Sequence, residues 1–211
     1  MRRFAFRPAL TLSGRPYKGL RGFAGKPFHP PLTDVPITAY LLTAVFDIVS
    51  IALRGGHPAA ARQLFLAGTW TLLGGAAVAV LAALTGWADW HRSSEPGTQA
   101  RRTVNAHAIT MIVVTVIVLV DLLARGLAYG DRSGTPAWIV VLSVVAAALV
   151  SVGATLGGSL VYDYGFNVET AGDSPVWHRS EVDVLPGRKP AQASVDAPAV
   201  AASGEQAEAS R

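Results

Sequence analysis

The segment PITAYLLTAVFDIVSIALR, residues 36–54, decides the fold class of this chain. Its apolar run is long enough to cross a bilayer as a helix, because a hydrocarbon core about 30 Å thick takes about 20 residues. One carboxylate, Asp47, lies well inside the run. The segment therefore predicts a membrane-spanning helix whose buried charge needs an explanation.

Three further segments have the same character. The expected spans cover about residues 35–54, 61–87, 104–128 and 136–162, and they are separated by Gly and Pro residues that interrupt helices. The third span is rich in β-branched residues, but in lipid every backbone polar group must be paired within its own segment, so a helix is expected there too. The sequence thus predicts an all-α, integral membrane four-helix bundle.

The composition agrees with a membrane protein. The chain has 211 residues, of which 51% are hydrophobic and 15% are charged, and its mean hydropathy is +0.36. Soluble domains carry about 25% charged residues. The absence of cysteine excludes disulfides, Cys-ligated zinc and an iron–sulfur cluster held by this sequence. The basic residues cluster beside the spans, as orientation signals do, so no nucleic-acid partner is expected despite a pI near 9.8.

The distribution of charge also predicts a topology. Fourteen of the 18 Lys and Arg residues lie in the amino arm, the second loop and the tail, which places both termini in the cytoplasm. The expected organisation is a basic arm over 1–33, a transmembrane domain over 34–163, an interfacial segment over 164–184 and a disordered tail over 185–211. The tail has almost no large apolar residue to offset its ordering entropy.

Polar residues inside the spans are functional candidates, because they are costly in lipid. Asp47, Asp121 and Thr69 are expected at similar depth. One interpretation is a proton or cation site built from the two carboxylates. The favoured interpretation is charge pairing: Asp121 and Arg125 are spaced i,i+4, and Asp47 can reach an arginine that extends inward, with Arg54, Arg62 and Arg125 as the alternatives.

A second group of polar residues is expected at the cytoplasmic ends of the spans. It comprises His29, Asp34, Asp89, Trp90, His91, His107, Tyr162 and Asp163. Histidines with carboxylates can ligate a metal, and two histidines can hold a haem. His29 is expected in a loop and only His107 in a helix, so hydrogen-bonding caps are the favoured interpretation. No nucleotide-binding or hydrolase motif is present, and the two helical hairpins show no persuasive internal repeat.

Several motifs, in this order, resemble a bacterial family of predicted membrane proteins of unknown function. They are Gly25-Lys26-Pro27-Phe28-His29-Pro30, Thr33-Asp34-Val35-Pro36-Ile37, Phe46-Asp47, Thr85-Gly86-Trp87-Ala88-Asp89-Trp90, Arg101-Arg102 with His107, and Gly157-Gly158-Ser159-Leu160-Val161-Tyr162 with Gly165 and Val168. The resemblance covers roughly residues 20–170. Members have four helices and are sometimes joined to a carboxyl-terminal Rieske iron–sulfur domain. This chain differs in two ways: Lys26 replaces the first histidine of a doubled His-Pro loop, and no cysteine follows.

The resemblance implies a bacterial plasma-membrane location and association with electron-transfer chemistry. Three functional hypotheses follow, in order of preference. The first is a non-catalytic membrane subunit or anchor, accessory to a respiratory complex. The second is a redox module that binds haem, a metal or a quinone through His29 and His107, and the third is a proton or cation conduit through Asp47 and Asp121. The expected partners are the lipid bilayer and other membrane proteins, among them respiratory-complex subunits.

Overall fold

Four long helices make up the part of the chain that the computed structural model describes, residues 27–130 and 134–168. They are α1 (His29–Leu53), α2 (Pro58–Ser93), α3 (Gln99–Ala128) and α4 (Ala137–Tyr162). The expected all-α fold is confirmed. Most of the predicted amino arm and interfacial segment, and the whole predicted tail, lie outside the described residues.

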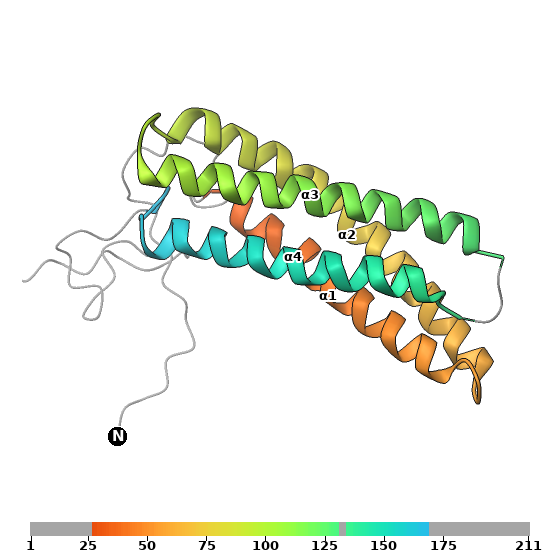
Figure 1. Ribbon diagram of the computed structural model, residues 1–211. Helices are drawn as coiled ribbons and strands as arrows, with labels where there is room; N and C mark the ends of the chain where they lie inside the picture. The colour runs from red at the N-terminus through yellow and green to blue at the C-terminus, as the bar shows by residue number, and fades with distance from the viewer. Residues whose placement is uncertain (1–26, 131–133, 169–211) are drawn as a thin grey trace, which may run out of the picture. The chain divides into compact units, whose positions relative to one another are not determined.

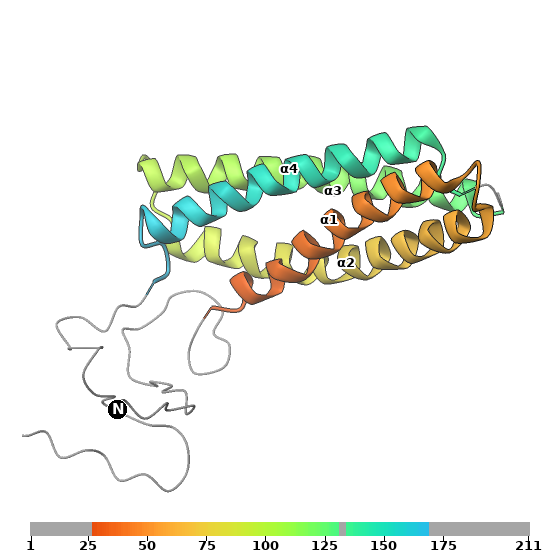
Figure 2. The same ribbon diagram turned by 90° about the horizontal axis from the view of Figure 1, so that it is seen from below.

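The helices form two antiparallel hairpins, α1–α2 and α3–α4, packed against each other (Figure 1). The turned view in Figure 2 shows α1 beside α2 and α3 beside α4, and α1 also packs on α4. Contact between α2 and α3 is the weakest of the four helix interfaces. The helices α1 and α3 therefore run in the same direction at diagonal positions of the bundle. The first turn of α1 and the last turn of α4 lie at the same end, as four membrane crossings require.

The exterior of the described bundle is apolar, unlike that of a soluble bundle, and its core combines apolar clusters with a few buried polar groups. All four helices are long and apolar enough to cross a membrane. Large apolar side chains cover the outside, among them Leu41, Val45, Ile48, Trp70, Leu73, Leu84, Ile112, Val116, Leu123, Val141, Val145 and Val152. The fully buried side chains include two aspartates, an arginine and several hydroxyl residues. An exterior of this kind is stable in lipid and would aggregate in water.

The start of α1 differs from the sequence-based expectation. The helix begins at His29, so the prediction that His29 lies in a loop is wrong. Pro30 and Pro31 occupy the first turn, where backbone N–H groups have no intrahelical partner and proline removes no hydrogen bond. At the same end of this hairpin, α2 continues to Ser93, beyond the expected limit of its span. His107 lies inside α3, so both histidines that were considered as ligands are helical.

Close approach of α1 and α2 depends on Gly75. A Cβ atom there would lie 2.5 Å from Ala39 Cβ and 3.2 Å from Tyr40 Cε1, whereas a Cβ on Gly74 would meet nothing within 4 Å. Small residues permit such contact between membrane helices. The small-residue face of α2 thus serves packing within the bundle.

We expect Gly75→Ala to destabilise the protein by about 1–3 kcal/mol, because the added methyl group overpacks the α1–α2 contact. Gly74→Ala is the matched control, and it is expected to be neutral or stabilising, since alanine favours a helix over glycine by about 1 kcal/mol. Thermal unfolding in detergent measures both effects. Equal melting temperatures for the two variants would contradict this account of the interface.

Candidate functional site

A fully buried arginine lies between the two hairpins. Arg125 has the largest side chain among the fully buried residues. Its Nε donates to Asp121 Oδ1 at 2.9 Å, one turn earlier in α3, and its Nη2 donates to Asp47 Oδ2 in α1. Both carboxylates are 0% exposed. These three side chains, which we call the ion triad, join the diagonal helices α1 and α3.

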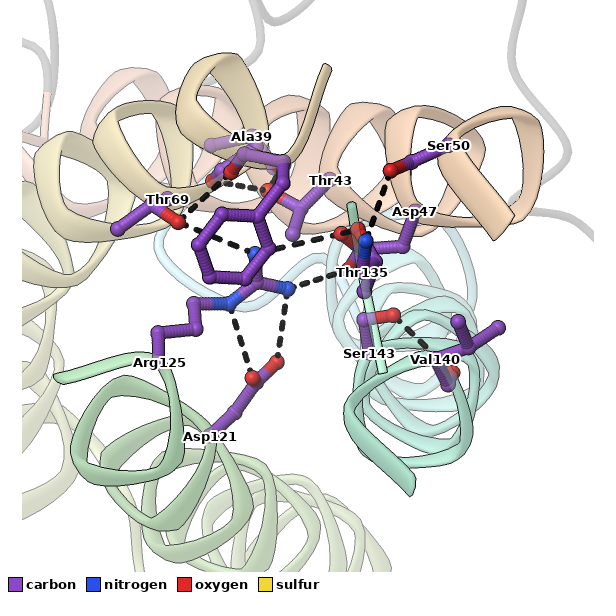
Figure 3. Close-up of polar contacts among 12 residues, drawn as sticks. Ala39, Thr43, Asp47, Ser50, Thr69, Asp121, Arg125, Thr135, Val140 and Ser143 are labelled. Atoms are coloured by element: carbon purple, nitrogen blue, oxygen red, sulfur yellow. Dashed lines mark hydrogen bonds and ion pairs between the residues drawn. The ribbon is translucent and has the colours of Figure 1, made fainter. Parts of the chain in front are cut away.

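Hydroxyl groups and an aromatic ring surround the ion triad (Figure 3). Thr135 Oγ1 donates to Asp47 Oδ1 at 3.0 Å, and Thr69 Oγ1 lies 3.4 Å from Arg125 Nη1. The guanidinium carbon lies 5.7 Å from the centre of the Phe65 ring, within reach of a cation–π contact. Side chains from α1, α2 and α3, together with Thr135 just before α4, thus meet at the ion triad.

The connection before α4 closes this end of the bundle. The Thr135 backbone N–H donates to Ser50 Oγ at 2.9 Å, and Ser50 Oγ donates to the Ala61 carbonyl at 2.6 Å. Gly134 has φ 89°, and a Cβ atom there would lie 2.9 Å from Ala61 Cβ. Glycine is therefore required on both conformational and steric grounds. The connection is therefore hydrogen-bonded to Ser50 of α1 and packs against Ala61 of α2. All three side chains of the ion triad are fully buried.

Every carboxylate oxygen of the ion triad receives a hydrogen bond. Asp121 accepts from Arg125 with both oxygens, and Asp47 accepts from Arg125 and Thr135. Of the three arginines that the sequence offered to Asp47, the structure brings Arg125 to it. This complete pairing is typical of a structural ion cluster, and proton or cation conduction through Asp47 and Asp121 stays a prediction.

Two histidines face each other near the other end of the same helices. The ring centroids of His29 and His107 are 6.3 Å apart, with the ring planes at 84°. His29 Nδ1 lies 2.8 Å from the Ala82 carbonyl oxygen in α2, and His107 Nδ1 lies 2.8 Å from the Gly153 carbonyl oxygen in α4. A carbonyl can only accept, so Nδ1–H is the donor in both contacts. In the neutral imidazole, Nε2 then carries the free lone pair on each ring.

A glycine on the neighbouring helix makes room for each histidine. A Cβ atom on Gly86 of α2 would lie 2.7 Å from His29 Cε1, and a Cβ on Gly157 of α4 would lie 3.3 Å from His107 Cε1. Each glycine is one helical turn after the carbonyl that the histidine binds. The same three-part arrangement of histidine, carbonyl and glycine therefore occurs in both hairpins.

Residues of the ion triad also occupy corresponding positions in the two hairpins. Asp47 and Arg125 are 78 positions apart, and His29 and His107 have the same separation. The matching carbonyls and glycines in α2 and α4 are 71 positions apart. The two hairpins thus share these corresponding positions, although α1 packs on α4 more extensively than α3 packs on α2. The sequence comparison of the hairpins did not reveal this relationship.

Of the remaining residues predicted at this end, Asp89 lies close enough to His29 to interact with it electrostatically. Asp34 and Tyr162 are exposed, and Asp89 is buried at 5% exposure. Trp90 donates to Asn105 Oδ1 at 2.8 Å and packs under the Arg101 guanidinium at 3.9 Å. Within the described residues, no three His, Cys, Asp or Glu side chains are placed to hold a metal ion together.

The structure adds partners that the sequence did not single out. They are Phe65, Gly68, Ser50 and Thr135 at the ion triad, and the carbonyls of Ala82 and Gly153 at the histidines. Backbone carbonyls leave no signal in the sequence. The glycine at 68 and the Gly134-Thr135-Pro136 turn could have been noticed as breaks in otherwise apolar segments.

Four long apolar helices that enclose a buried ion cluster in an otherwise apolar core define a multi-pass membrane protein. The chain belongs to the family described as "Predicted membrane protein (DUF2231)", whose profile matches residues 25–170. Comparison with curated proteins and with solved structures gives no match.

We expect Arg125→Gln to destabilise the protein by about 3–5 kcal/mol, because it leaves two buried carboxylates without their cation. Arg102→Gln, at an exposed position in the first turn of α3, is the control and is expected to have little effect. The double variant Asp47→Asn with Arg125→Gln should recover part of the loss, since it removes both charges of one pair. Thermal unfolding in detergent provides the measurement, and an additive double variant would argue against a direct ion pair.

Proposed function

We propose that this protein is a haem-binding electron-transfer module of the membrane, with His29 and His107 as the axial ligands. The observation that carries the proposal is the facing pair of imidazole rings on diagonal helices, each with Nδ1 bonded to a carbonyl. Haem would supply one-electron chemistry, which none of the protein side chains at this place provides.

The number of ligands favours haem over a bare metal ion. Protein sites for zinc and similar ions use three or four protein ligands. In the described part of the chain, no three His, Cys, Asp or Glu side chains are placed to hold a metal ion together, although the buried Asp89 carboxylate lies close enough to His29 to interact with it electrostatically. A haem brings most of its iron ligands in its own macrocycle, so His29 and His107 would be enough to hold it.

The separation of the rings has the size that such a site needs. An imidazole nitrogen lies about 2 Å from a metal that it binds. The centroids of His29 and His107 are 6.3 Å apart, which would let both rings reach one metal between them.

The surroundings hold the histidines in place for a ligand. Histidines that bind metals commonly donate their other ring N–H to a carbonyl or carboxylate, which fixes the tautomer and the ring orientation. The Ala82 and Gly153 carbonyls provide such acceptors. Gly86 and Gly157 let the rings lie against the backbone of the neighbouring helices.

This role fits a non-catalytic subunit of a respiratory assembly. The chain carries no catalytic motif, and the histidines lie near one end of the bundle, where a partner protein can approach. The electron would pass between the haem and that partner. Stoichiometric copurification with other membrane proteins tests this part of the proposal, and a protein that always purifies alone would contradict it.

We expect purified protein, loaded with haem where the host does not supply enough, to show the visible spectrum of a low-spin haem with one iron per chain. His29→Gln and His107→Gln should each reduce haem retention by tenfold or more, because each removes one of two axial bonds. His91→Gln is the control, since His91 is exposed and stacks on Trp87. Absorption spectra and iron analysis provide the measurement; colourless protein without iron after loading would disprove the proposal.

A further inference from the structure

A cavity of about 540 Å³ lies at the end of the bundle opposite the histidines. It is lined by Pro58, Ala59 and Arg62 from the first turns of α2 and by Tyr129 and Gly130 after α3. This volume is in the range of small-molecule sites. The ion triad and the histidine pair contribute none of the lining residues, so the cavity is separate from both.

Arg62 has one donor that no group in the described part of the chain satisfies. Its Nη2 donates to the Tyr129 carbonyl, and its guanidinium lies 5.2 Å from the Phe65 ring centre and 5.3 Å from that of Tyr129. Its Nη1 is buried and has no hydrogen-bond partner. A buried donor on a charged group is costly when unpaired. An acceptor in the cavity would remove this cost once the guanidinium turns Nη1 toward it.

The amino end of α2 adds positive potential at the same place. The helix begins at Pro58, and the preceding residue, His57, supplies no side-chain cap. Pro58 has no N–H and the Ala61 N–H donates to the His57 carbonyl, so Ala59 and Ala60 carry the first-turn N–H groups that remain for an external acceptor. The helix dipole favours an anion there. Ala59 in this turn lines the cavity together with Arg62. The preferred acceptor is thus an oxyanion.

The position in the membrane identifies the source of that oxyanion. Arg62 lies in the second turn of α2 and Tyr129 follows the last residue of α3, so the cavity lies where the spans leave the hydrocarbon core. Phospholipid phosphates lie at this level, and tyrosine is enriched there. We propose that the cavity binds the phosphate group of an anionic phospholipid, held by Arg62 and the first turn of α2.

The experiment measures phosphatidylglycerol retained by the purified full chain, using native mass spectrometry after exchange into mixed micelles. Wild-type protein is expected to retain this lipid about tenfold more strongly than Arg62→Gln, which corresponds to one charged hydrogen bond. Arg62→Lys should retain an intermediate amount, because it keeps the charge without the planar fork. Arg102→Gln, an exposed arginine at the other end of the bundle, is the matched control and should bind as wild type does.

A second variant keeps the test independent of any folding defect. Ala59→Leu narrows the cavity while it keeps the Arg62 side chain, and alanine and leucine favour a helix almost equally. It should lower lipid retention while leaving the melting temperature of the delipidated protein unchanged. Equal retention by wild type, Arg62→Gln and Ala59→Leu would overturn the proposal. Displacement of the lipid by millimolar inorganic phosphate would overturn the assignment to a phospholipid, because it would identify a free anion as the ligand.

Discussion

The ion pair between Arg125 and Asp47 is the interaction on which the rest of the bundle depends. In lipid, the hydrophobic effect does not drive helices together, so packing and polar contacts decide how they associate. The helices α1 and α3 lie at diagonal positions and are held apart by α2 and α4. The pair spans that diagonal with both partners at 0% exposure, and Thr135 attaches the start of the fourth helix to the same carboxylate.

The histidine pair depends on this ion pair through the geometry of the helix. His29 precedes Asp47 by 18 residues, and His107 precedes Arg125 by the same number. This spacing is about five full turns, so the two members on each helix lie on one face, about 27 Å apart. The Asp47–Arg125 contact therefore constrains the rotation and height of α1 against α3 at the histidine end as well, although Pro36 lies inside α1 between the two positions. The rings themselves are oriented by their hydrogen bonds to the Ala82 and Gly153 carbonyls.

The sequence predicted the features that depend on composition and on spacing within one helix. Long apolar runs predicted the four spans, and i,i+4 spacing predicted that Asp121 and Arg125 can meet. The choice of Arg125 for Asp47 depends on helix rotation, which a single sequence does not specify. The helical position of His29 was missed because prolines were interpreted as helix breakers, although the first turn accepts them. The repeat was hidden because its offset is 78 residues between α1 and α3 and 71 between α2 and α4.

Corresponding positions of the two hairpins carry different chemistry at the two ends of the bundle. At the ion triad, corresponding positions carry opposite charges, Asp47 and Arg125, which satisfy each other and leave no need for a third group. At the other end, corresponding positions carry identical imidazoles, His29 and His107, whose donors point outward to helix carbonyls. In the neutral form, two imidazoles that both donate through Nδ1 have no N–H left with which to bond each other. The two ends of the bundle therefore differ in chemistry: paired charges close one end, whereas the other presents two imidazole rings, on which the proposed haem site rests.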